Sequence, residues 1–130
     1  ITEYLAQIGM RDASKKLNQK VAYQDACHLA HAQRVRSAPR DLLKAIGCEV
    51  IELPHADQCC GSAGVYNVAQ NELSMKILEA KMDDVSSVAD SAQVLATANV
   101  GCLIQLRAGA AKRGMMLPVK HIVELLDEAF

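Results

Sequence analysis

The chain has 130 residues, of which 51% are hydrophobic, and its formal net charge is −1. This length suits one domain with a substantial core, so we expect residues 1–130 to form a single domain. No apolar stretch approaches the roughly 18–20 residues of a membrane-spanning helix, and the opening residues lack the pattern of a signal peptide. Positive charges are scattered, and nothing indicates a nucleic acid partner. The densest group, Arg34, Arg36 and Arg40, is interpreted as a solvated helix face rather than a phosphate site.

The chain begins with Ile1 and not with Met. We therefore expect it to be a fragment of a longer protein, or a processed product of one. Any function inferred from these residues then belongs in part to the larger protein.

Helix and strand patterns alternate along the chain. Apolar residues at helical spacing, such as Leu73 and Ile77, mark the helices, and short runs such as residues 21–24 (VAYQ) are typical of strands. In chain order we expect a helix over 2–8, a polar linker over 11–20, a strand over 21–24, a helix over 39–46, a strand over 48–53, a loop over 55–65, a helix over 72–84 capped by Asn71, a strand over 93–97, a helix over 101–112, a strand over 118–121 and a helix over 123–130. This order predicts an α/β fold, with a mainly parallel sheet of about four strands and helices on both faces.

Four of the five cysteines follow predicted strands. Cys27 comes after the first strand, Cys59 and Cys60 come after the second, and Cys102 comes after the third, where a helix begins. The carboxyl ends of parallel strands meet at one edge of the sheet, where open α/β sheets bind ligands. We therefore predict that these four cysteines lie together. Cys48 begins a strand away from that edge and is interpreted as a small buried hydrophobe.

This arrangement favours metal binding or redox chemistry over structural disulfides, which are rare in cytosolic α/β proteins. The helix start at Cys102 favours a thiolate, while Gly61 and Gly64 allow a tight turn that aims N–H groups at sulfur. Four thiolates suit either a zinc ion or an iron–sulfur cluster. No Cys-x-x-Cys occurs, so neither a zinc-ribbon nor a ferredoxin pattern is matched. The adjacent Cys59 and Cys60 leave open a third function, thiol–disulfide exchange through a strained, reactive disulfide.

The four histidines carry less information. His28 and His31 lie close to Cys27 in the sequence and could reach the site, although a capping or surface role suits them equally. We interpret His55 and His121 as structural.

Several segments resemble a known family. Residues 59–64, with the sequence CCGSAG, resemble the CCG motif of the cysteine-rich domains in heterodisulfide reductase and its relatives. Residues 23–31 (YQDACHLAH) and 59–67 (CCGSAGVYN) resemble the cysteine segments of glycolate oxidase iron–sulfur subunits. Residues 98–109 and 121–126 are similar to later parts of the same subunits, so the resemblance covers nearly the whole chain.

The resemblance implies that residues 1–130 are one cysteine-rich CCG domain, the C-terminal of two in a longer subunit. It implies an iron–sulfur cluster, of the [4Fe–4S] type, on Cys27, Cys59, Cys60 and Cys102. Zinc is the alternative, and an isolated fragment can lose its cluster.

The implied function is electron transfer within a glycolate oxidase complex. The domain would relay electrons from a flavin-containing subunit toward an acceptor such as membrane quinone. The complex would be cytoplasmic, at the inner face of the membrane, and this domain alone is not expected to be catalytic. A sister complex for another 2-hydroxy acid, such as lactate, stays open as an alternative.

One position departs from the heterodisulfide reductase pattern. Domains of that branch carry Cys-x-x-Cys in the third segment, and here Asn99 stands at the first of those positions, so that only Cys102 remains. This argues against ligation by five cysteines and against direct disulfide reduction. It also keeps open a zinc-binding or metal-free module that docks subunits.

Overall fold

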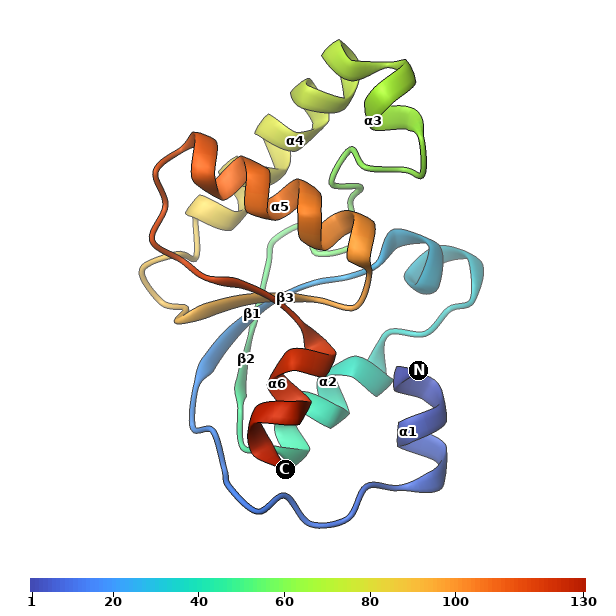
Figure 1. Ribbon diagram of the computed structural model, residues 1–130, viewed down its shortest axis with the longest axis vertical. Coiled ribbons are helices and arrows are strands. Elements are labelled where there is room, and N and C mark those ends of the chain that lie inside the picture. Colours follow the sequence, from blue (N-terminus) through green and yellow to red (C-terminus); the bar gives the residue numbers. More distant parts are fainter.

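The computed structural model describes all 130 residues. Figure 1 shows a sheet between two layers of helices. The elements are α1 (Thr2–Ile8), β1 (Lys20–Gln24), the π-helix η1 (His28–Ala32), α2 (Ser37–Ala45), β2 (Glu49–Glu52), α3 (Tyr66–Ala69), α4 (Asn71–Ser86), β3 (Val94–Thr97), α5 (Val100–Lys112), β4 (Val119–His121) and α6 (Ile122–Ala129). The strand order is β2-β1-β3-β4, and every neighbouring pair is parallel. The predicted α/β fold with a parallel sheet of four strands is confirmed.

The two central strands, β1 and β3, are buried on both faces of the sheet, as is usual for parallel strands connected by helices. On the central strand β1, Val21 and Tyr23 face α2 and α6, while Ala22 between them faces α4 and α5. All three side chains are fully buried. Figure 1 shows α4 and α5 on one side of the sheet and α1, α2 and α6 on the other, as expected for helices on both faces.

Three local predictions differ from the structure. Asn71 was expected to cap α4, which is wrong, because Asn71 is the first residue inside this helix and its Nδ2 donates to Asn67 O at 3.2 Å. The helices η1 and α3 were not predicted. They have 5 and 4 residues, too few to show an apolar period in the sequence.

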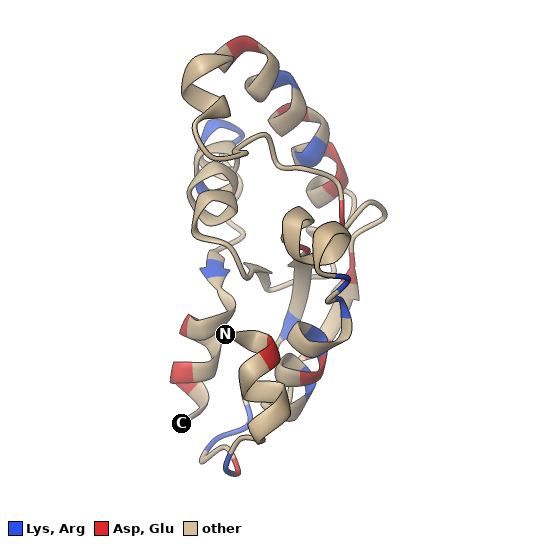
Figure 2. Cartoon of the chain, turned by 90° about the vertical axis from the view of Figure 1, so that its right-hand side faces the viewer, with Lys and Arg blue, Asp and Glu red and all other residues tan.

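No helix of this chain has the length and the apolar character that crossing a bilayer requires. In Figure 2, Lys and Arg residues alternate with Asp and Glu residues along the chain and form no extended face of one sign in that view.

Candidate functional site

The four cysteines singled out by the sequence follow the carboxyl ends of three strands. Cys27 lies between β1 and η1, Cys59 and Cys60 lie between β2 and α3, and Cys102 lies in the first turn of α5. Because the strands are parallel, these positions share one edge of the sheet. Cys48 lies just before β2, at the opposite end of that strand, and is buried in the core beside α2 and α6.

The four thiols are free. Cys60 and Cys102 are buried in the core under α4 and α5, whereas Cys27 and Cys59 are partly exposed. The adjacent Cys59 and Cys60 therefore differ in exposure. No three His, Cys, Asp or Glu side chains surround a common point where they could hold a single metal ion.

Contacts among the thiols shift their pKa values in different directions. The hydrogen bond donated by the Cys102 thiol lowers the pKa of Cys60 to about 7, and the Ser62 N–H adds to this effect. The same bond, together with burial, raises the pKa of Cys102. Burial, followed by the neighbouring Cys59, raises the pKa of Cys27. Repulsion between thiolates thus opposes full ionisation of the group, and a cation bound among them would offset this repulsion.

The CCG segment turns sharply at Gly61. This residue has φ of 89°, a conformation that favours glycine, and its N–H donates to Cys59 Sγ at 3.3 Å. A Cβ atom at this position would lie 2.5 Å from Ser74 O, so only glycine fits without a shift. Gly64 has φ of 65°, but its N–H donates no hydrogen bond to a sulfur.

Arg40 on α2 joins the ends of β1 and β2. Its guanidinium donates to both oxygens of Asp25 at 2.8 and 3.0 Å, and to both oxygens of Glu52 at 2.7 and 2.8 Å. The Arg40 side chain is only 17% exposed. Arg34 and Arg36 are exposed as predicted, but they lie between η1 and α2 and not on a helix face. For Arg40 the prediction of a solvated side chain is wrong. The sequence missed this clamp because the two acidic partners come from separate strand ends.

A second set of polar contacts ties the loop before Cys59 to the rest of the fold. The buried Lys81 on α4 donates to His55 O and pairs with Asp84 at 3.1 Å, and Asp84 accepts the His55 backbone N–H. From β1, the Gln24 amide donates to Gln58 O at 2.9 Å. The loop is therefore held by α4 on one side and by the end of β1 on the other.

The hydrogen bonds of the histidine rings go to groups other than the cysteines. Nε2 of His31 lies 3.1 Å from Asp57 O, and Nδ1 of His121 accepts a backbone N–H in the first turn of α6. His55 Nδ1 lies 3.2 Å from Asp84 Oδ1. His28 reaches the site with its backbone, which hydrogen-bonds Cys27 and lowers the pKa of that thiol against the larger raising effects.

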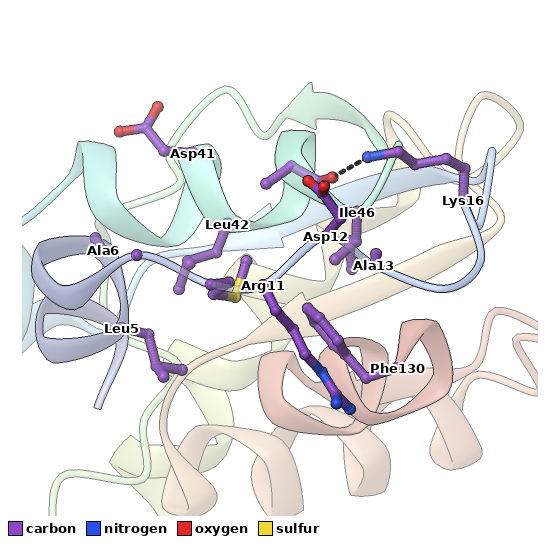
Figure 3. A pocket seen from close by; sticks show the side chains of 13 residues that line it. Leu5, Ala6, Arg11, Asp12, Ala13, Lys16, Asp41, Leu42, Ile46 and Phe130 are labelled. Carbon is purple, nitrogen blue, oxygen red and sulfur yellow. Dashed lines mark hydrogen bonds between the residues drawn. The ribbon is translucent and has the colours of Figure 1, made fainter.

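A hollow of about 280 Å³ lies elsewhere, between α1, α2 and Phe130 at the end of the chain (Figure 3). Apolar side chains such as Leu5, Leu42 and Ile46 line much of it. The guanidinium carbon of Arg11 lies 5.4 Å from the centre of the Phe130 ring. No cysteine or histidine lines this hollow, so it is separate from the cysteine edge.

Residues 21–107, from β1 into α5, match the family described as the cysteine-rich domain, CCG. The chain belongs to this family. The match contains all four cysteines of the carboxyl edge, as well as the arginine clamp and the buried Lys81.

Relatives of this CCG domain are longer proteins. It is 45% identical over 121 residues to the "Probable glycolate oxidase iron-sulfur subunit" of Bacillus subtilis (strain 168), a match that covers 91% of this chain and 27% of the relative. It is 30% identical over 129 residues to "Lactate utilization protein A 1" of Bacillus mycoides (strain KBAB4), covering 98% of this chain and 52% of the relative. It is 31% identical to "Lactate utilization protein A" of Geobacillus sp. (strain WCH70), covering 98% and 53%. The chain thus spans between about a quarter and about half the length of these curated relatives.

Proposed function

We propose that this CCG domain transfers electrons through an iron–sulfur cluster, of the [4Fe–4S] type, held by Cys27, Cys59, Cys60 and Cys102. The observation that carries the proposal is the gathering of four free thiols at one edge of a parallel sheet. A relative at 45% identity bears the name of an iron–sulfur subunit, which supports iron over other metals.

The donor set fits such a group. Four thiolates are the usual ligands of a [4Fe–4S] cluster, one to each ligated iron, so they need not converge on a single point. When bound, the cluster would supply one-electron redox chemistry. The chain would hold it by its thiolates, shield it by burying Cys60 and Cys102, and donate a hydrogen bond to Cys59 from the Gly61 N–H.

The name of the Bacillus subtilis relative supports glycolate as the source of the electrons. We place the domain in a complex that oxidises glycolate at a flavin on another subunit and passes electrons toward an acceptor such as quinone. The relatives named for lactate utilization make a different 2-hydroxy acid the second candidate. The complex would work in the cytoplasm, with peripheral contact to the membrane, and this domain would relay electrons without itself being catalytic.

Anaerobic reconstitution with iron and sulfide tests the proposal. We expect about four iron atoms per chain, a broad visible absorption band and an EPR signal after reduction. Cys102→Ser should abolish iron uptake, because it removes a ligand. Cys48→Ser is the matched control and should take up iron as the wild type does, since Cys48 lies in the core away from the edge.

Two outcomes would overturn the proposal. A colourless protein that takes up no iron under anaerobic conditions would exclude the cluster. Stoichiometric zinc without iron, in protein purified without oxygen, would instead favour a structural module that docks subunits. Turnover of a model disulfide that is lost in Cys60→Ser would instead support a thiol–disulfide enzyme acting through Cys59 and Cys60.

A further inference from the structure

Two buried polar side chains connect α5 and α4 to the CCG segment. Gln105 on α5 donates from Nε2 to Ser74 Oγ at 3.1 Å. Ser74 on α4 in turn donates from Oγ to Gly61 O at 2.8 Å. Ser74 is fully buried and Gln105 nearly so. An unbroken hydrogen-bonded relay therefore leads from the middle of α5 to the backbone beside the cysteine pair.

The relay ends on the peptide group between Gly61 and Ser62, next to the cysteine pair. The carbonyl of Gly61 belongs to the same peptide unit as the N–H of Ser62, which is directed at Cys60. The N–H of Gly61 itself donates to Cys59 Sγ at 3.3 Å. A hydrogen bond accepted by a peptide oxygen polarises that peptide and strengthens the bond its N–H donates. The Ser74 hydroxyl thus acts on Cys60 through the Ser62 N–H, and it holds in place the turn from which the Gly61 N–H donates to Cys59.

The surroundings indicate that the relay is more than a generic anchor between helices. The neighbouring contacts of α4 and α5 are apolar, among them Leu78, Met82 and Leu106, and a polar pair buried in such an interface is costly unless it is fully hydrogen-bonded. The Ser74 carbonyl also approaches Gly61 so closely that no side chain fits there. Ser74 therefore contacts the turn with both its hydroxyl and its backbone.

We propose that Ser74 and Gln105 are positioning residues that raise the reduction potential of the group bound by Cys59 and Cys60. The inference rests on the proposed cluster. Hydrogen bonds to sulfur stabilise the reduced form, which carries one more negative charge, over the oxidised form, and so raise the potential. The relay strengthens and orients those bonds, and its loss lowers the potential.

Redox titration of the reconstituted protein, followed by EPR, tests this assignment. We expect a lower midpoint potential in Ser74→Ala, and a smaller shift in the same direction in Gln105→Met, which keeps the volume and removes only the outer donor. Ser86→Ala is the matched control on the same helix. The Ser86 hydroxyl bonds to Met82 O, far from the turn, so its loss should leave the potential unchanged.

Amide hydrogen exchange in the metal-free protein provides a second readout that does not need a cluster. We expect the Ser62 N–H to exchange about tenfold faster in Ser74→Ala than in the wild type, the change that follows from losing a hydrogen bond of ordinary strength. If neither the wild type nor any variant binds iron, the proposal of a cluster is wrong, but the exchange rates still test the relay. Wild-type midpoint potentials in cluster-loaded Gln105→Met and Ser74→Ala would overturn the inference. An unchanged exchange rate of the Ser62 N–H in Ser74→Ala would also overturn it. If Ser74→Ala does not fold, Gln105→Met decides alone by both measurements.

Discussion

Asn99 caps the helix that carries Cys102. It stands where the heterodisulfide reductase pattern has a cysteine, and its Oδ1 accepts the Cys102 N–H at 3.0 Å as the N-cap of α5. Asparagine is among the preferred capping residues because its short side chain reaches a free N–H of the first turn. The residue that departs from the pattern thus fixes the start of the helix that carries Cys102.

Gly61 offers a test at the same scale. Gly61→Ala places a Cβ atom 2.5 Å from Ser74 O at φ of 89°, so both steric overlap and backbone strain oppose it. We expect a loss of about 2–4 kcal/mol in the free energy of unfolding, measured by urea denaturation. Gly114→Ala is the control, because Gly114 also has positive φ and nothing lies within 4 Å of its added Cβ. Equal losses in the two variants would show that the close approach at Gly61 has no energetic consequence.

At the scale of elements, the cysteine loops are positioned by charged contacts between α2, α4 and the strand ends. Arg40 bridges Asp25 and Glu52, which lie at the carboxyl ends of β1 and β2. Bidentate pairs of this kind fix geometry as well as charge. On the other side of the loop, Lys81 and Asp84 form a buried pair on α4. The loop that carries Cys59 is therefore held by elements far apart in the sequence.

The Arg40 clamp predicts a dependence of stability on pH. The Arg40 guanidinium lowers the pKa of Glu52 below its ordinary value of 4.5. A carboxylate with a lowered pKa in the folded state stabilises the fold above its unfolded pKa, and this contribution is lost as pH falls from about 4.5 through the folded value. Glu52→Gln should therefore lose less stability than the wild type between pH 6 and 3, by less than about 1 kcal/mol because Glu52 is half exposed.

Urea denaturation across that pH range measures the difference. Glu49→Gln is the matched control on the same strand, since Glu49 is exposed and its nearest cation, on Lys20, is 3.9 Å away. We expect its pH profile to parallel that of the wild type. A Glu52→Gln profile that also parallels the wild type would contradict the role assigned to the clamp.

The sequence predicted the elements better than it predicted the contacts between them. Short strand-like runs between helical patterns predicted all four strands, and the parallel order followed from their alternation with helices. The placement of Cys27, Cys59 and Cys102 after strands also needed only the local pattern. The Arg40 clamp, by contrast, is a contact between residues 12 and 15 positions apart, and the Ser74 relay spans two helices. No local pattern encodes such contacts, so only the folded structure could reveal them.

At the scale of the whole molecule, the candidate site occupies an edge of the sheet while the cores occupy its two faces. The face under α4 and α5 has 13 buried residues and the face under α2 and α6 has 12. Among these, only Cys60 and Cys102 belong to the candidate site. Both cysteines contribute buried surface to the core under α4 and α5. The site thus draws little on the interactions that hold the fold together.

This separation predicts that the metal-free chain folds and that loading adds stability. We expect cooperative thermal unfolding without a cluster, and a higher midpoint after anaerobic loading, because a group that binds only the folded state stabilises it. Cys102→Ser should show no such rise. Leu125→Ala removes a fully buried side chain on the far face and should cost about 2–5 kcal/mol in both forms. Distant sites contribute additively, so the gain from loading should be the same in Leu125→Ala as in the wild type. A metal-free chain without a cooperative transition would instead show that the cysteine edge is required for folding.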